Sequence, residues 1–485
     1  MDHVKVAIVG AGAGGLGLAA RLRQSGETSL ALFDRAEGVG GTWRANTYPG
    51  AASDVPSHLY SFSFAANPDW SRRFPPQAEM LRYLERLTDD FGLRSHLRLG
   101  TDVAGARFDS GSRRWRLELD GGEHVEASVL VAACGQLSVP HVPEFEGLDE
   151  YRGAHWHSAR WDHSFAPRIP GARVGVIGSG ASAIQIVPRL AGVARELHVF
   201  QRTAPWIIPR RDRAYTRAER WLFARFPAWR RAYRSYIYLR LESFFLGFGP
   251  SDHFARQLTK MATKHLEEHV ADPVLRDELT PRYRIGCKRI LVDDDYYDAL
   301  QKPGVELFTE SIERFVPEGV RTADGRVHEL DAVVFATGFD SQALVAPMRV
   351  EGSDGRTLDD IWSDGPEAHL GMTVAGLPNF FLVYGPNTNL GHNSILFMFE
   401  CQFDYVLECL AEMRRRGARS MEVRPEAMAR YNRRLQSDLS ESVWAGACTN
   451  WYKNASGRVT NNWSGFATAY WWATRRPDAR DYAFA

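Results

Sequence analysis

The sequence predicts an α/β fold with two doubly wound domains and a helical insertion. A β-branched run, a glycine turn and a helical pattern follow one another in "VKVAIVGAGAGGLGLAARLRQSG", and the order recurs from Ala172 in "ARVGVIGSGASAIQIVPRLAG". Each unit has a later apolar strand that ends in glycine, "SVLVAACGQ" (128–136) and "AVVFATGF" (332–339). Repeated strand–turn–helix units with return strands are typical of Rossmann-like, dinucleotide-binding domains.

The first glycine turn has the spacing G-x-G-x-x-G, formed by Gly10, Gly12 and Gly15. The first glycine permits a tight turn, the second lets the backbone approach a pyrophosphate, and the third lets helix and strand pack closely. The next strand, "LALFD", ends in Asp34, nineteen residues after Gly15, where a carboxylate can bind both ribose hydroxyls. An acid there disfavours a 2′-phosphate, so we expect FAD or NAD, and FAD once the second turn is considered.

The second glycine turn reads G-x-G-x-x-A, with Gly178, Gly180 and Ala183. Its acid is missing, because the following strand ends in "QRT" with Arg202 and Thr203. A cation and a hydroxyl can accept the 2′-phosphate of NADP. We therefore expect NADPH here, with a solvated surface Arg202 as the alternative. Two different dinucleotides in one chain indicate hydride transfer from NADPH to FAD.

The repeat, and the different composition of the residues between its parts, predict five segments. Residues between the second unit and its return strand are rich in Arg, Ala, Leu and aromatics at helical spacing. This insertion either packs on the domain below, or forms a lid or substrate wall, or lies on a membrane surface. The predicted segments are the first part of the FAD domain (1–148), the first part of the NADP domain (149–213), the helical insertion (214–278), the second part of the NADP domain (279–345), and a linker with the second part of the FAD domain (346–485).

Composition excludes several classes of protein. The 485 residues carry 59 Lys plus Arg and 59 Asp plus Glu, a balance that does not indicate a nucleic-acid partner. No apolar run approaches the length of about 18 residues needed for a membrane span, and "MDHVKVAIVG" does not resemble a signal peptide. The five cysteines form no C-x-x-C, so we expect no metal centre and no dithiol redox centre. Their odd count suits a reducing compartment, and we expect the cytoplasm.

Three further motifs resemble those of the type I Baeyer–Villiger monooxygenases of the flavin-containing monooxygenase superfamily. "YRGAHWHSARWD" has the family's fingerprint spacing, from Tyr151 to Asp162. The loop "GGTWRANTYPGAASD" (40–54) matches a second motif, and "CKRILVDDDYY" (287–297) a third. The matched positions are Tyr151, Gly153, His157, Trp161 and Asp162; Gly41, Trp43, Tyr48, Pro49, Gly50 and Asp54; and Lys288, Arg289, Tyr296 and Tyr297.

The resemblance implies a function and residues for it. NADPH reduces FAD, O2 gives a C4a-peroxyflavin, and one oxygen atom is inserted next to a ketone carbonyl to form an ester or lactone. Arg289 matches the family's active-site arginine, Asp54 the carboxylate that holds it, and Lys288 a lysine that grips the 2′-phosphate. His157 resembles a residue that couples the domains. Positions that line FAD in the family fall on Thr42, Trp43, Asp54 and Tyr60, with Val103 beside the adenine.

Two alternatives stay open at this point. A related flavin monooxygenase would oxygenate nitrogen or sulfur instead of a ketone, although Asp54, Arg289 and the 151–162 fingerprint favour the ketone. A non-catalytic NADP-sensing protein would bind nucleotide without turnover, which the flavin-site residues argue against. Disulfide reductases share the two-domain plan but need a cysteine pair that the spacing does not offer. "RANT" after Trp43 and Cys134 depart from the family pattern without removing a proposed catalytic group.

Overall fold

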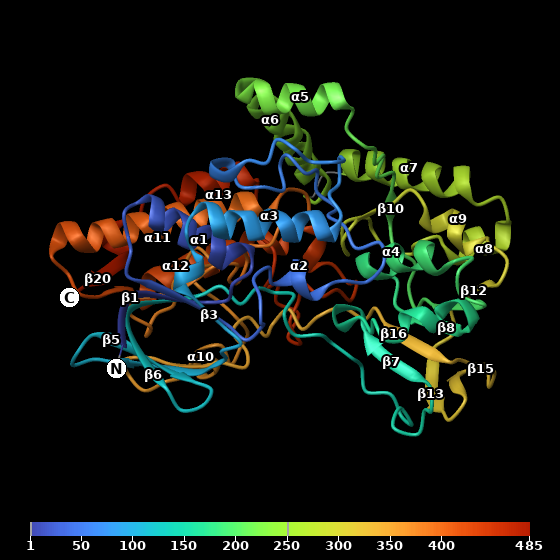
Figure 1. Ribbon diagram of the computed structural model, residues 1–485, viewed down its shortest axis with the longest axis horizontal. Helices are drawn as coiled ribbons and strands as arrows, with labels where there is room; N and C mark the ends of the chain where they lie inside the picture. Colours follow the sequence, from blue (N-terminus) through green and yellow to red (C-terminus); the bar gives the residue numbers. More distant parts are fainter. Residues whose placement is uncertain (1, 250–251) are drawn as a thin grey trace.

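The computed structural model describes residues 2–249 and 252–485, and it contains the two predicted sheets (Figure 1). The first sheet has strand order β17-β4-β5-β6-β1-β2-β3, with β18 paired to β6. β1, β2, β3, β6 and β18 run parallel, so this part is a doubly wound sheet. The strands are β1 (Asp2–Val9), β2 (Leu30–Asp34), β3 (Leu97–Leu99), β4 (Val103–Asp109), β5 (Arg114–Leu119), β6 (His124–Ala132), β17 (Arg349–Glu351) and β18 (Phe380–Leu382).

The second sheet is parallel throughout, in the order β12-β9-β8-β16-β7. Its strands are β7 (Ala154–His157), β8 (Arg173–Ile177), β9 (Glu196–Phe200), β12 (Val305–Phe308) and β16 (Ala332–Phe335). Three small sheets complete the described strands: β10 (Ile207–Ile208) with β11 (Leu291–Val292), β13 (Ile312–Val316) with β14 (Gly319–Thr322) and β15 (Val327–Glu329), and β19 (Met421–Val423) with β20 (Tyr482–Phe484).

Helices cover both large sheets, and the last third of the chain returns to the first sheet through β17 and β18. The α-helices outside the insertion are α1 (Ala13–Gln24), α2 (Thr42–Ala45), α3 (Gln77–Asp90), α4 (Ala181–Leu190), α9 (Tyr296–Leu300), α10 (Leu358–Ile361), α11 (Ile395–Arg416), α12 (Pro425–Ser440) and α13 (Ala467–Ala473). Short 3₁₀ turns are η1 (Ser63–Ala65), η2 (Arg94–His96), η3 (Ser158–Arg160), η4 (Ala166–Gly171), η5 (Phe244–Gly247), η6 (Val443–Ala445) and η7 (Ala479–Asp481).

The predicted insertion is helical in the structure. It comprises α5 (Arg217–Arg225), α6 (Pro227–Ser243), α7 (Asp252–His269) and α8 (Pro273–Glu278). Thr216 begins α5 with a capping box completed by Glu219, and Pro227 begins α6 at a position where a missing N–H costs nothing. The limits of the five segments stay a prediction. The described residues do not include residue 1 of the first segment or residues 250–251 of the insertion.

Glycine is required in the first turn because the backbone approaches itself there. Gly10 has φ +109°, and a Cβ on it would lie 2.4 Å from the carbonyl oxygen of Ala133. A Cβ on Gly15 would lie 1.9 Å from the carbonyl oxygen of Gly10. α1 can therefore pack onto β1 only with glycine at position 15. In the second turn, Ala183 takes the third place and is fully buried.

We expect Gly15→Ala to destabilise the protein. The new methyl group would overlap a backbone oxygen that cannot rotate away, and overpacking of this kind costs about 1–3 kcal/mol. A thermal melt should show a lower Tm than the wild type. Gly171→Ala is the matched control, since a Cβ on Gly171 would have nothing within 4 Å and the φ of this residue is not positive. Equal Tm values for the two variants would contradict this account of the turn.

None of the helices within residues 2–249 and 252–485 has the length and apolarity needed to cross a membrane.

Candidate active site

A cavity of about 1100 Å³ lies where the two glycine turns open toward each other. Residues from both sheets, the 40–54 loop, the segment before β11 and the C-terminal segment line it. Most predicted site residues meet here: Gly10, Gly12, Asp34, Thr42, Trp43, Asp54 and Tyr60 from the first set, and Gly178, Gly180, Arg202, Thr203, Lys288 and Arg289 from the second.

Three predicted residues do not line the cavity. Gly15 and Ala183 lie behind their turns, where they set the packing of α1 and α4. Val103 is buried at the start of β4, in the core of the first sheet. Its side chain does not face the cavity, so the contact with an adenine stays a prediction.

The first glycine turn leaves backbone donors free for an anion. α1 begins at Gly12 with no acidic residue in its first turn, and no side chain among the described residues caps its leading N–H groups. Such an N-terminus is a binding site for phosphate. Asp34 accepts hydrogen bonds from the N–H groups of Ala11 (2.6 Å) and Ala36 (2.8 Å), which orient its carboxylate at the cavity edge. The arrangement fits the phosphates and ribose of a dinucleotide.

The second turn repeats this arrangement and adds cations. α4 begins at Gly180, again without a cap or an acid, and space is open beyond that glycine. Arg202 and Lys288 both line the cavity, and no carboxylate within the described residues pairs with either. Burial lowers the pKa of Lys288, and the charge of Arg202 lowers it further. Two cations that line one cavity can attract an anion.

The 40–54 loop follows β2 of the first sheet, but its hydrogen bonds connect it to the domain of the second sheet. The Tyr48 hydroxyl donates to Gln185 Oε1 (3.0 Å) on α4, and Gln185 Nε2 donates to the carbonyl of Ala52 (3.0 Å). Arg210, which follows β10, donates to the carbonyl of Ser53 (2.8 Å). These bonds fix the backbone that leads directly into Asp54.

Asp54 and Arg289 form an ion pair on the cavity wall. Arg289 Nε donates to Asp54 Oδ2 at 3.0 Å, and a second guanidinium nitrogen contacts the same oxygen. Burial by itself would raise the pKa of Asp54, but the guanidinium of Arg289 and then the charge of Arg210 lower it overall. The Asp54 charge raises the pKa of Arg289 against the effect of burial. Arg289 is therefore a permanently charged group with a fixed orientation.

The 151–162 fingerprint has a structural role at the crossing between the two sheets. The Tyr151 hydroxyl donates to the Leu330 carbonyl (3.0 Å), and a Cβ on Gly153 would lie 2.1 Å from that hydroxyl oxygen. His157 Nε2 is 2.8 Å from the Gly338 carbonyl, and its Nδ1 accepts from the Ala159 N–H. Burial lowers the pKa of His157. Both ring nitrogens contact backbone groups near the second sheet, and a role in coupling the two domains stays a prediction.

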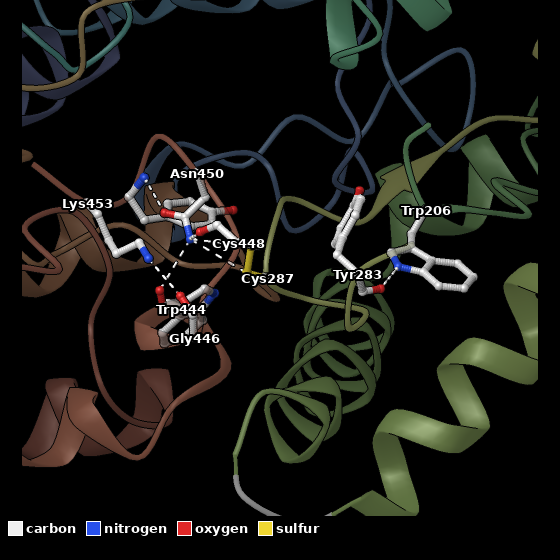
Figure 2. The surroundings of a disulfide bond; sticks show 9 residues. Trp206, Tyr283, Cys287, Trp444, Gly446, Cys448, Asn450 and Lys453 are labelled. Atoms are coloured by element: carbon white, nitrogen blue, oxygen red, sulfur yellow. Dashed lines mark hydrogen bonds between the residues drawn. A yellow bond between two sulfur atoms is a disulfide. The ribbon is translucent and has the colours of Figure 1, made fainter. Parts of the chain in front are cut away.

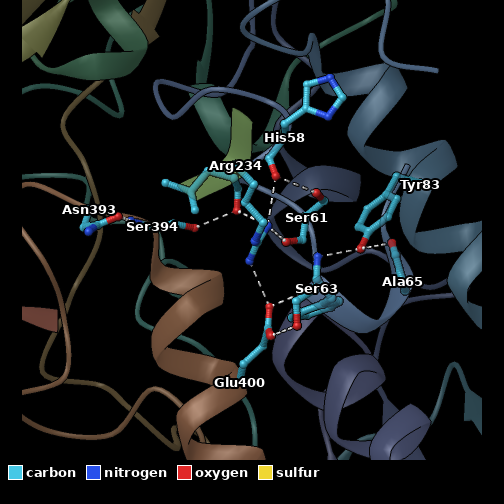
Figure 3. Close-up of polar contacts among 11 residues, drawn as sticks. His58, Ser61, Ser63, Ala65, Tyr83, Arg234, Asn393, Ser394 and Glu400 are labelled. Atoms are coloured by element: carbon cyan, nitrogen blue, oxygen red, sulfur yellow. Dashed lines mark hydrogen bonds and ion pairs between the residues drawn. The ribbon is translucent and has the colours of Figure 1, made fainter. Parts of the chain in front are cut away.

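Sequence reasoning missed several residues of the cavity. Tyr384, which follows β18, donates its hydroxyl hydrogen to Asn389 Oδ1 (2.8 Å), and Trp451 lines the cavity from the C-terminal segment. A cluster beyond the cavity was also missed (Figure 3). There Arg234 of α6 donates to the carbonyls of His58 (2.9 Å), Leu59 (3.1 Å) and Ser61 (2.6 Å), and pairs with Glu400 of α11 (3.2 Å). The insertion thereby holds the segment that presents Tyr60.

A disulfide joins Cys287 and Cys448, a bond that the sequence did not predict (Figure 2). The two residues are 161 positions apart, so their spacing could not indicate the bond. Two of the five cysteines are paired, and only Cys134, Cys401 and Cys409 are free. The odd count therefore no longer supports the expectation of a reducing compartment. The bond joins the residue before Lys288 and Arg289 to the residue before Thr449, Asn450 and Trp451, which also line the cavity.

We expect the disulfide to stabilise the enzyme through the long loop that it closes. The chain-entropy model gives roughly 5 kcal/mol as the upper end for a loop of this length. Adding dithiothreitol to the wild type should lower its Tm by several degrees. The Cys287→Ser/Cys448→Ser double variant should melt at the lower temperature with or without the reductant. Five thiols titrating in the unfolded, unreduced protein would contradict the bond.

Fold and site together define an oxidoreductase with two nucleotide sites and one fixed cation between them. The flavin-binding monooxygenase-like family model matches residues 3–344. A Baeyer–Villiger monooxygenase of Pseudomonas aeruginosa is 44% identical over 482 residues, which cover 99% of this chain and 91% of the relative. The chain belongs to the flavin-binding monooxygenase-like family, in its Baeyer–Villiger group.

Solved structures agree with that assignment. An oxidized steroid monooxygenase bound to NADP is similar with a TM-score of 0.87 and 31% identity, covering 99% of each chain. A complex of OTEMO with FAD and NADP has a TM-score of 0.88 and 28% identity, again covering 99% of each chain. These two structures share the two-sheet architecture described above, so the predicted fold class is confirmed.

Proposed function

We propose that the chain inserts one oxygen atom next to the carbonyl of a ketone, with NADPH and O2 as co-substrates, and gives an ester or lactone. It is a FAD-dependent NADPH Baeyer–Villiger monooxygenase. The observation that supports the residue roles best is the Asp54–Arg289 pair in a cavity onto which both glycine turns open. We further propose that the enzyme works on a small-molecule ketone in the cytoplasm.

FAD supplies the redox chemistry when bound, taking a hydride from NADPH and activating O2. We assign its pyrophosphate to the free N–H groups at Gly12 and the start of α1, and its ribose to Asp34. Thr42, Trp43 and Tyr60 line the same part of the cavity, with the Trp43 and Tyr60 rings edge to face at 5.8 Å. These two rings offer apolar surface on which a flavin could pack.

We assign NADPH to the second turn. Gly178 and Gly180 open the start of α4 to its pyrophosphate, and Arg202, Thr203 and Lys288 surround the position for the 2′-phosphate. The repulsion that lowers the pKa of Lys288 would be relieved by a dianion between the two cations. This is the physical basis for preferring NADPH to NADH.

Arg289 has the electrostatic role. Oxygen insertion develops negative charge on the carbonyl oxygen of the ketone, and a guanidinium that is already held in place stabilises such charge without reorganising. Asp54 holds the guanidinium in place and offsets the free energy of burying it. Asp54 is therefore a positioning residue for Arg289.

A ketone panel tests the function. Cyclic, linear, aryl and steroidal ketones are incubated with the holoenzyme, NADPH and O2, and products are identified by mass spectrometry. We expect the mass of at least one ketone to increase by one oxygen atom. Hydrolysis of that product should give an acid and an alcohol, or a hydroxy acid, which identifies it as an ester or lactone. If amines or sulfides gain oxygen and no ketone does, the N- or S-oxygenating alternative replaces this proposal. A colourless protein that does not oxidise NADPH would indicate a sensing role instead.

A further inference from the structure

The outer face of the α5–α6 hairpin exposes a concentration of large apolar side chains. Figure 1 shows α5 and α6 projecting from the body of the molecule. Phe226 joins the two helices, and its ring meets that of Trp221 edge to face at 5.6 Å. We call the exposed set the hairpin face: Trp221, Phe226, Trp229, Tyr236 and Leu239, with exposed fractions of 60%, 47%, 54%, 57% and 66%.

The exposed side of the same hairpin also carries positive charge. Arg217, Arg225, Arg231 and Arg240 are exposed, and no ion pair within the described residues involves them. The two acids of the hairpin are engaged elsewhere. Glu219 pairs with Arg213 and caps α5, and Glu242 is buried, where it accepts hydrogen bonds from Asn393 (2.8 Å) and Thr468 (2.9 Å). The hairpin face therefore combines aromatic side chains with cations and contains no free carboxylate.

The opposite side of the hairpin packs against the body of the molecule. Phe223 lies on the His58 ring at 4.1 Å, and Tyr215 and Tyr233 complete that contact. Arg220 pairs with Asp69, and Arg234 holds the 58–61 segment as described above. The packing of the insertion onto the body uses these side chains, and the hairpin face stays exposed.

We propose that the hairpin face docks on the surface of a lipid bilayer that contains anionic lipids. Trp and Tyr side chains favour the boundary between headgroups and acyl chains, and arginines bind lipid phosphates. The hairpin would lie in that boundary without crossing it, in agreement with the absence of a membrane-spanning helix among the described residues. The proposal does not depend on the reaction assigned to the cavity.

Charge argues against a second copy of the chain as the occupant. A two-fold symmetric dimer would bring the same patch of each subunit together. Four unpaired arginines would then face four others with no carboxylate between them, and like charges across an interface are unfavourable. A surface of phosphate groups complements the hairpin face, whereas its own copy does not.

Co-sedimentation with vesicles tests the proposal on the full-length holoenzyme. The probes are vesicles of phosphatidylcholine alone and of phosphatidylcholine mixed with phosphatidylglycerol. We expect the wild type to bind the mixed vesicles, to bind phosphatidylcholine more weakly, and to be released by salt. Arg225→Glu/Arg231→Glu should lower the partition coefficient about twentyfold or more, because each arginine near an anionic surface contributes about fivefold. Trp221→Ser/Trp229→Ser should lower it on both kinds of vesicle.

A control variant removes one exposed arginine and one exposed apolar side chain elsewhere. Arg116 and Val327 are exposed on β5 and β15, away from the hairpin in Figure 1, and Arg116→Glu/Val327→Ser should bind vesicles like the wild type. All variants should oxidise NADPH at the wild-type rate without vesicles. Failure of the wild type to bind mixed vesicles would overturn the proposal, as would equal loss in the control. A concentration-dependent dimer that the hairpin variants abolish would also overturn it and make the face a subunit interface.

Discussion

Replacing Arg289 with alanine is expected to abolish ester formation while FAD binding and NADPH oxidation remain. The guanidinium is the charged group that the structure fixes on the cavity wall, through Nε and a terminal nitrogen on Asp54. Loss of one preorganised donor to a developing oxyanion typically lowers kcat by roughly a hundred- to a thousandfold. Product mass and NADPH consumption, measured in the same reaction, separate the two half-reactions.

Two further variants make that result interpretable. Arg284 lies in the same segment as Arg289, but its guanidinium contacts the Gly249 carbonyl and Asp252 and does not face the cavity. The Arg284→Ala variant should therefore form ester normally. Arg289→Lys keeps a charge but loses the planar fork, so we expect an intermediate yield. Normal ester yield from Arg289→Ala would remove the role assigned to this residue.

The pH dependence of the pair has a defined sign. The pKa of Asp54 is lowered in the folded protein, so its carboxylate stays charged down to an acidity at which an ordinary aspartate is protonated. The stability that the pair contributes is present above the pKa of an unfolded aspartate and is lost as pH falls through the lowered value. Arg289 stays charged throughout, because the Asp54 carboxylate raises its pKa.

The Arg202→Ala/Lys288→Ala double variant is expected to raise KM for NADPH by about a hundredfold or more, with a much smaller change for NADH. A hydrogen bond to a charged group contributes about 1.5–3 kcal/mol, so each cation accounts for roughly ten- to a hundredfold. Steady-state kinetics with both coenzymes supplies the measurement, and NADH is the internal control because it has no 2′-phosphate. An equal loss with both coenzymes would show that the two cations bind another part of the nucleotide.

Lys288 adds a pH signature to that prediction. Burial and the charge of Arg202 lower its pKa in the free enzyme. NADPH affinity should therefore begin to fall with rising pH before an ordinary lysine would titrate, and the Lys288→Arg variant should shift the decline to higher pH.

Local patterns in the sequence were sufficient to predict the two sheets. A glycine turn between a β-branched strand and a helix has short-range causes, such as the approach of Gly15 to the Gly10 carbonyl, so it leaves a signature within a few residues. The Asp54–Arg289 pair, 235 residues apart, was predicted from family resemblance rather than from spacing. Its roles in catalysis, and those of the nucleotide-site residues, stay predictions until they are measured.

Contacts made only by tertiary packing could not be predicted. Cys287 and Cys448 lie in segments with no common pattern, and the structure alone brings them together. Arg234 looks like one of many arginines in the insertion, yet it is buried against three backbone carbonyls and Glu400. Val103 has its side chain in the core of the first sheet, and its contact with an adenine stays a prediction.

The bonds of Tyr48 and Ala52 to Gln185 limit how the two halves of the molecule can move. α4 carries the second nucleotide turn, and the loop carries Asp54. If the two halves separated at this point, the loop would lose its bonds to α4, and the backbone that positions Asp54 would no longer be held. A rotation of one half against the other that keeps both bonds intact would therefore pivot close to Gln185, and the parts of the molecule farthest from Gln185 would move most.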